Sequence, residues 1–484
     1  MTQNIQQMSL WDQVACRVYT PMAILFPTEP TAKPSEIKFH LQCALHRLGQ
    51  AYPNLAGRLI LANDKKVHLV TSSSTYIELE VMTDDFGLSY AALREQGFPV
   101  KPFIKPEYNL PGGLEVGSPV RVFRVRILFI DGGFVMFVYL HHAFADGNCR
   151  NVVLQLLANA THLDDPIPNL PSSSRTLDLP YNQVQYQKDW KTLLEACPEY
   201  TLLPNPTGPT QPIFPAQDAE FGLTDNTGLV FVIDSGRLDV ICKLAKDFKL
   251  SKYMALAAIT WVHTVRARIE TLPADYTAYF ANKKPTLINA HHWANPRKGL
   301  FKGNASLGEY FGNAIAMPLT IHHGTVDSLV EACYWHDHLT QGRVPEALLQ
   351  VVKSVTDTNL GVDEDFVLRR TALFANMPNL RFLGLNQDPR DPYCVGFNTH
   401  QSVGGKAGFV FPGVPRDGNT GRTVPDAIRR VQGQFSPLTH GLILPARPGL
   451  APGEMELMIT LPHAAMGFLL EDQAFMSLVK RVIG

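Results

Sequence analysis

Two ionisable side chains stand four positions apart in the stretch from Tyr139 to Gly147, which reads YLHHAFADG. His142 is followed by three small or apolar residues and then by Asp146. A neutral imidazole can take a proton from an alcohol or an amine near pH 7, because its ordinary pKa is about 6.5. We therefore expect His142 to act as a general base and the carboxylate of Asp146 to anchor the loop that carries it.

The segments around this stretch explain how the histidine is positioned. The runs Val120 to Ile130 and Phe134 to Leu140 are β-branched and aromatic, and Asp131-Gly132-Gly133 between them is typical of a tight hairpin. After Gly147, apolar residues recur at helical spacing, at Val152, Val153, Leu156, Leu157 and Ala160. Asp146 and Asn148 are both suitable N-caps for this helix. The histidine is thus predicted to lie where a strand ends and a turn leads into a helix.

The length and the charge balance limit what the chain can be. With 484 residues, two domains of roughly 200 residues or more are the natural expectation. Lys plus Arg number 43 and Asp plus Glu number 44, with no basic block. We therefore expect no nucleic-acid partner, and no attraction to a membrane surface either.

The cysteines and the N-terminus indicate the compartment. Seven cysteines are scattered along the chain without a CxxC pair, which is typical of reduced thiols and of neither a disulfide framework nor a zinc site. The first residues are polar and do not have the pattern of a signal peptide, and no apolar run reaches transmembrane length. We expect a soluble cytoplasmic protein.

The residues from His142 to Gly147 resemble the HxxxDG signature of the BAHD-type acyltransferases and their relatives, which include chloramphenicol acetyltransferases, condensation domains and fungal HxxxD acyltransferases. Further landmarks of the family follow in the expected order. They are Pro53 to Leu59 (PNLAGRL), Leu250 to Trp261 with its serine N-cap, Tyr310 to Ala314 (YFGNA), and the final strand and helix from Glu454 to Phe475. Together the landmarks run from about residue 10 to about residue 475.

The resemblance implies an α/β fold of two chloramphenicol-acetyltransferase-like lobes, with mixed sheets flanked by helices and a central channel between the lobes. Residues 1–215 would form the N-terminal lobe, which carries the HxxxD loop and ends in a Pro-rich crossover. Residues 216–484 would form the C-terminal lobe. Acyl-CoA would enter the channel from one side and the acceptor from the other.

The resemblance also implies the reaction. An acyl group would pass from acyl-CoA, the co-substrate, to a hydroxyl or amine of a small hydrophobic secondary metabolite, with His142 as the base and with no bound cofactor. Asp146 would support the loop, paired with an arginine. Ser251, Lys252 and Asn313 would be the contacts for CoA, and the chain would act as a monomer.

One landmark is altered. The family's DFGWGxP turn corresponds to Asn419 to Pro425, which keeps the first glycine and the proline, and the family's arginine follows at Arg429. The aspartate of that turn, which pairs with an arginine in the family, is replaced by Asn419. His291 stands at the position of the arginine, so we expect a neutral hydrogen bond between His291 and Asn419, with Arg297 as the rival partner.

Other kinds of chemistry remain to be weighed. No two histidines have the helical i, i+4 spacing of zinc enzymes and no G-x-S-x-G elbow occurs, so we expect neither a metal site nor a serine hydrolase. His141 is expected to be structural. A condensation-like or non-acylating enzyme, or a donor held on a carrier protein, is the alternative function. The sequence leaves open the acceptor, the acyl chain length, O- against N-acylation and the oxyanion donor.

Overall fold

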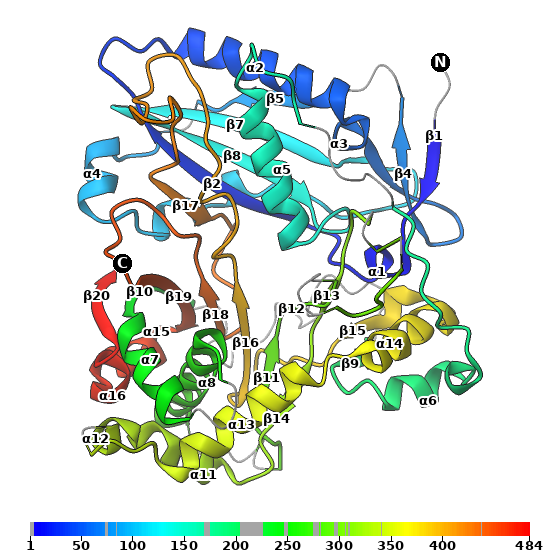
Figure 1. Cartoon of the computed structure of the whole chain (residues 1–484), viewed down its shortest axis with the longest axis vertical. Coiled ribbons are helices and arrows are strands. Elements are labelled where there is room, and N and C mark those ends of the chain that lie inside the picture. Colours follow the sequence, from blue (N-terminus) through cyan, green and yellow to red (C-terminus); the bar gives the residue numbers. More distant parts are fainter. Residues whose placement is uncertain are drawn as a thin grey trace.

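The computed structural model describes residues 4–72, 76–83, 85–168, 175–203, 226–245, 250–273, 280, 282–294, 299–304, 306–307, 310–339, 341–436 and 438–484. Two large mixed sheets organise it, one in each lobe (Figure 1). No helix among these residues combines the length and hydropathy needed to cross a bilayer.

The sheet of the N-terminal lobe is built on the predicted hairpin. Its strands, in spatial order, are β17 (Ala427–Arg430), β2 (Tyr19–Pro27), β8 (Gly133–His141), β7 (Phe123–Ile130) and β5 (Glu78–Val81). All residues of β8 are buried, and alternate side chains enter two different apolar clusters on the two faces of the sheet. Gly132 has a φ of +77° in the hairpin turn, and any side chain at Gly133 would collide with the ring of Tyr90.

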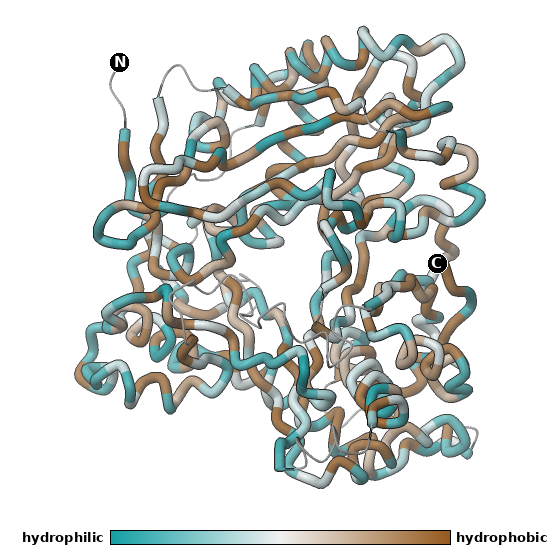
Figure 2. The backbone as a smooth tube through the Cα atoms, turned by 180° about the vertical axis from the view of Figure 1, so that it is seen from behind, coloured by the Kyte–Doolittle hydropathy of each residue, from teal (hydrophilic) through white to brown (hydrophobic). Residues whose placement is uncertain are grey.

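Two long helices cover one face of this sheet, and a small sheet extends it. The helices are α2 (Pro34–Ala51) and α5 (Gly147–Ala160), and their apolar sides pack into the core formed with β2, β7 and β8. The small sheet has the order β1 (Asn4–Gln7), β4 (Val67–Thr71), β3 (Arg58–Leu61) and β6 (Val120–Arg121). Figure 2 shows hydrophobic residues along the strands of this lobe.

The C-terminal lobe contains the larger sheet. Its order is β14 (Leu319–Ile321), β11 (Thr286–Asn289), β16 (Cys394–Thr399), β18 (His440–Ile443), β19 (Glu454–Pro462), β10 (Asn226–Asp234) and β20 (Val479–Ile483). The buried helix α8 (Lys252–Thr271) packs on it, and Trp261 is part of that core. Other helices of this core are α7 (Ser235–Leu244), α11 (Val326–Glu331), α12 (Trp335–Leu339), α13 (Glu346–Leu360), α15 (His463–Glu471) and α16 (Gln473–Met476).

A third apolar cluster contains Trp11 and Trp293, and several of the remaining helices and strands contribute to it. The elements are α1 (Leu10–Gln13), α3 (Pro53–Ala56), α4 (Tyr90–Glu95), α6 (Trp190–Glu195), α14 (Glu364–Asn376), and the strand pairs β9 (Tyr200–Leu202) with β15 (Leu383–Leu385) and β12 (His291–His292) with β13 (Ile315–Ala316). A short 3-10 turn, Val184–Tyr186, precedes α6.

The strand β17 joins the two halves of the chain. It pairs antiparallel with β2, so a segment beyond residue 420 completes the sheet of the N-terminal lobe. Arg429 of β17 is fully buried and forms a bidentate ion pair with Glu456 of β19, with Nη to Oε distances of 2.8 and 3.2 Å. Arg447 donates to the same carboxylate at 2.8 Å, and Arg429 also donates to the backbone carbonyl groups of Gly97 and Phe98. This buried group therefore links both lobes.

The predicted α/β fold of two lobes is confirmed. The strand and helix predicted on either side of the HxxxD loop are found as β8 and α5. The boundary between residues 215 and 216 lies outside the described residues, so the domain division stays a prediction.

We expect Glu456→Gln to lower the free energy of unfolding by about 3–5 kcal/mol, because it leaves two buried guanidinium groups without their shared negative charge. Urea unfolding followed by circular dichroism would measure it. Glu454→Gln is the matched control in the same strand: Glu454 is partly exposed and lies 3.6 Å from Lys480 Nζ, so a change below about 1 kcal/mol is expected. Equal losses in the two variants would contradict a special role for Glu456.

Candidate active site

His142 follows the last residue of β8 and is held through its backbone. Its N–H donates to the carbonyl of Val18 at 2.8 Å, and its own carbonyl accepts from Nδ2 of Asn313 at 2.8 Å. Nδ1 of the ring has no hydrogen-bond partner in the described parts of the chain. Burial and then the charge of Arg150 lower the pKa of His142 below its ordinary 6.5. The ring is therefore neutral at pH 7, and one of its nitrogens is not engaged by protein.

Asp146 fixes the loop from within the fold. It is completely buried and is the N-cap of α5, where Oδ1 accepts from the N–H groups of Asn148 and Cys149 at 3.0 and 2.9 Å. Oδ2 accepts from the N–H of Ala314 at 3.0 Å. The carboxylate ties the turn after His142 to the YFGNA segment.

The expected arginine partner of Asp146 is replaced by a histidine. His292 Nε2 lies 3.4 Å from Oδ2 of Asp146, whereas no ion pair joins Asp146 to an arginine among the residues that the structure describes. Burial acts to raise the pKa of Asp146, but His292 and the N–H groups of Cys149 and Ala314 outweigh it, so the pKa is lowered. Within the described residues the partner is therefore His292, and the arginine expected from the resemblance is not found there.

Asn313 connects the catalytic loop to the N-terminal helix. Its Nδ2 donates to the carbonyl of His142 and to Oδ1 of Asp12, at 2.8 and 2.9 Å, and its backbone N–H donates to the same Oδ1 at 2.8 Å. Asn313 is 3% exposed, so its amide nitrogen is fully used inside the protein. These contacts make Asn313 a positioning residue for His142.

Arg175 is a residue of this site that the sequence did not reveal. It lies in the first Pro-rich stretch, is 1% exposed, and its Nη2 lies 3.0 Å from Oδ2 of Asp12. Its guanidinium also donates to the carbonyl groups of Phe144 and Phe311 and stacks on the ring of Phe144, 4.2 Å from the centroid. A single arginine among prolines and serines gives no periodic signal, so only the fold could show this role.

His141 and the remaining CoA candidates lie apart from this network. His141 is buried, donates through Nε2 to the carbonyl of Gly112 at 2.8 Å and accepts at Nδ1 from the N–H of Ala143, in agreement with a structural role. Ser251 caps α8, and Lys252 pairs with Asp239 at 2.9 Å. Neither lines the cavity beside His142. The CoA contacts of Ser251, Lys252 and Asn313 stay predictions.

The altered turn does not pair with His291. Asn419 is exposed, and its backbone N–H donates to Asp417 within the turn at 3.0 Å. Nδ1 of His291 instead lies 3.4 Å from Oδ1 of Asn359 on α13. The expected hydrogen bond between His291 and Asn419 is therefore wrong, since the turn lies at the surface. The rival partner, Arg297, lies outside the described residues.

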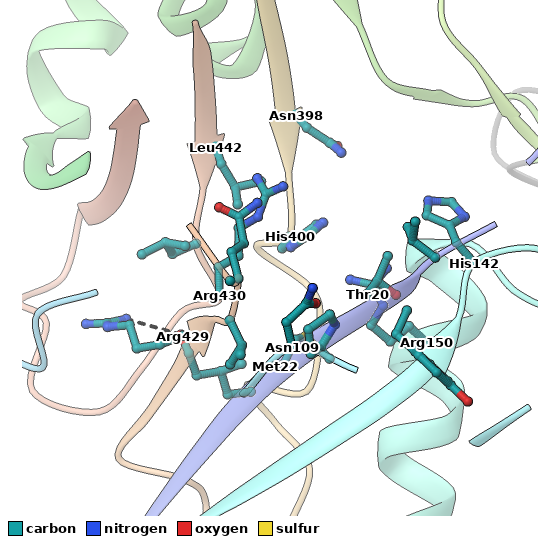
Figure 3. A pocket seen from close by; sticks show the side chains of 18 of the residues that line it. Thr20, Met22, Asn109, His142, Arg150, Asn398, His400, Arg429, Arg430 and Leu442 are labelled. Atoms are coloured by element: carbon teal, nitrogen blue, oxygen red, sulfur yellow. Dashed lines mark hydrogen bonds between the residues drawn. The ribbon is translucent and has the colours of Figure 1, made fainter. Parts of the chain in front are cut away.

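A cavity of about 680 Å³ lies between the two sheets, and His142 is in its wall. The residues that line it come from β2, β16, β17 and β18 and from the start of α5, so both lobes contribute (Figure 3). Apolar side chains form part of the wall, among them Met22, Ile428 and Leu442, and polar ones form the rest. A neutral histidine with an unengaged nitrogen thus faces a space large enough for a small organic molecule.

The sequence matches known acetyltransferases in part. Residues 18–161 match the family profile described as the trichothecene 3-O-acetyltransferase-like N-terminal domain. The trichothecene 3-O-acetyltransferase TRI101 of Fusarium sporotrichioides is 23% identical over 282 residues, which are 54% of this chain and 59% of that protein. The aligned part thus falls short of two thirds of that relative.

Solved structures match over the whole length. TRI101 of F. graminearum with coenzyme A and deoxynivalenol superposes with a TM-score of 0.75 at 17% identity, covering 99% of this chain and 100% of that one. Vinorine synthase superposes with a TM-score of 0.58 at 16% identity, covering 99% and 98%. The chain has the BAHD acyltransferase fold. The resemblance inferred from the motifs is thereby confirmed, and the N-terminal match includes the BAHD signature from His142 to Gly147.

We expect Asp146→Asn to lower the free energy of unfolding by about 1–3 kcal/mol, because an amide NH₂ in place of Oδ2 would face the N–H of Ala314. Thermal and urea unfolding would measure this. Asp189→Asn is the matched control, since Asp189 caps α6 in the same way at an exposed position. Equal effects in the two variants would show that capping alone matters and that the contact with Ala314 does not.

Proposed function

We propose that this chain moves an acyl group from acyl-CoA to a hydroxyl or amine of a small secondary metabolite, with His142 as the general base. One observation carries the proposal: the unengaged, neutral ring of His142 lines a cavity between the lobes of a BAHD fold. The similar TRI101 structures contain coenzyme A together with a mycotoxin, which supports a CoA thioester as donor and a small molecule as acceptor.

The geometry supports a direct transfer. His142 would take the proton of the acceptor hydroxyl while the hydroxyl oxygen attacks the thioester carbonyl of the donor. The tetrahedral intermediate then expels the CoA thiolate, which receives the same proton from the imidazolium. The thioester is reactive enough for this path, so no covalent acyl-enzyme is required. Asp146, Asn313 and Arg175 keep the loop in place through their hydrogen bonds within the protein.

The surroundings of the reaction form part of the same proposal. Acyl-CoA and the acceptor are the two partners, the chain acts as a monomer, and no cofactor takes part. Seven free cysteines support a cytoplasmic location. The apolar part of the cavity wall, which includes Met22 and Leu442, supports an acceptor with a hydrophobic body.

We expect His142→Ala to reduce the release of thiol from acetyl-CoA by about 10²- to 10⁴-fold, because the base is lost while the binding surfaces remain. Thiol release would be followed with a panel of small alcohols, and binding of acetyl-CoA by calorimetry. His46→Ala, at an exposed position of α2, is the matched control and should retain wild-type rates. Failure of the wild type to bind CoA would remove the acyl-CoA proposal and favour a carrier-bound donor or a non-acylating reaction.

The pH dependence gives a second test. Burial and Arg150 lower the pKa of His142, so the base stays deprotonated at pH values where an ordinary histidine becomes protonated. As the pH falls, kcat/KM should therefore decline with a midpoint below pH 6.5. Rates measured from pH 5 to pH 8 in buffers of constant ionic strength would establish this. A decline centred at or above pH 6.5 would contradict His142 as the base in this environment.

A further inference from the structure

Two guanidinium groups line the cavity, and neither pairs with a carboxylate of the described residues. Arg150 of α5 is 4% exposed and forms no hydrogen bond or ion pair with any residue in the described part of the chain. Arg430 of β17 donates through Nη2 and Nε to the side-chain oxygen of Gln432, at 2.6 and 2.9 Å, and to no charged group that the structure describes. Figure 3 shows Arg150 on the same side of the cavity as His142 and Arg430 on the opposite side, near His400.

The neighbouring Arg429 lines the same cavity but, unlike Arg150 and Arg430, is paired with a carboxylate. Its guanidinium is bidentate to Glu456. No aspartate or glutamate is found among the described residues that line the cavity. Asp146 attracts Arg150 from a distance, but its oxygens are already occupied by backbone N–H groups and by His292. Within the described structure, no carboxylate in the cavity wall therefore compensates the positive charges of Arg150 and Arg430.

Uncharged imidazole and amide side chains line the cavity together with the two guanidinium groups. Burial and then Arg430 lower the pKa of His440 to about 3, and burial with Arg150 and Arg430 lowers that of His400 well below its ordinary value. Both rings are thus uncharged at pH 7 and can donate one hydrogen bond each. Asn109 and Asn398 add amide groups to the same wall. The cavity offers two fixed positive charges and several donors, beside an apolar region.

Such an arrangement suits an anion on the ligand. Leaving charged groups out of water without a partner is costly, and a bound anion would remove that cost at the moment of binding. The planar fork of an arginine matches the two oxygens of a carboxylate. Because His142 lines the same cavity, an acceptor held by its anionic end could still present a hydroxyl to the base.

We propose that the acceptor is a hydroxy acid, whose carboxylate binds between Arg150 and Arg430 while its hydroxyl is acylated at His142. This inference rests on the proposed acyl transfer and specifies the class of acceptor. The reaction is unchanged: the hydroxyl proton passes through His142 to the CoA thiolate, and the carboxylate takes no part in bond making. The other source of an anion in this cavity would be a phosphate of CoA, and the experiment separates the two.

The test compares matched acceptors and matched variants. Aromatic and alicyclic hydroxy acids are assayed beside their methyl esters, by thiol release from acetyl-CoA and by direct calorimetric titration of each compound into the protein. We expect the acids to bind and react about 10- to 100-fold better than the esters, the gain of a charge-assisted hydrogen bond. Arg150→Gln and Arg430→Gln should remove this preference mainly through KM. Arg422→Gln, at an exposed turn, should not change it.

Each of the other outcomes would overturn either the hydroxy-acid proposal or the proposed acyl transfer. Acids and esters that bind and react equally well would overturn the hydroxy-acid assignment while leaving acyl transfer intact. Loss of CoA binding in Arg150→Gln and Arg430→Gln, with no preference for acids, would assign the charges to CoA. A large fall in the melting temperature of Arg150→Gln would show a structural role instead, since no protein partner is lost in that variant. Binding of acids without any thiol release would support the anion site and contradict the proposed function.

Discussion

The position of the catalytic loop depends on one buried carboxylate, that of Asp12. It accepts two hydrogen bonds from Asn313 and pairs with Arg175, and those two residues in turn hold the carbonyl groups of His142 and Phe144. Three segments that are far apart in sequence thus converge on the backbone of a single turn. Because each partner is buried, removing one would leave another unsatisfied. The base is therefore oriented by contacts with its main chain, and its ring remains available to a substrate.

The local parts of this arrangement could be predicted from the sequence. The hairpin, the strand end at His141 and the capping of α5 by Asp146 all follow from residues within about 40 positions, where periodicity and turn chemistry are informative. The long-range parts could not. Arg175 and His292 have no neighbours in sequence that indicate their partners, and the pairing of β17 with β2 joins segments about 400 residues apart.

The altered DFGWG-like turn is held by hydrogen bonds of its own at the surface. Asn419 lies at the surface, and Asp417 supplies the carboxylate that accepts from the N–H groups of the turn, which lowers the pKa of Asp417. Arg429, which corresponds to the arginine of the landmark, is buried and bound to Glu456. Both positions belong to one sequence landmark, but Arg429 is buried whereas Asn419 is exposed. The arginine is held by the interface between the lobes, and the turn residues are not.

The strand β17 also constrains the order in which the molecule can form. Its partner β2 covers residues 19–27, whereas β17 lies at residues 427–430. During synthesis, the edge of β2 that β17 will cover stays without this partner until about 400 further residues have been made. Pairings of this sequence separation are slow to form because a long loop has to be closed first. The sheet that contains β2 can therefore be completed only after β17 has been made.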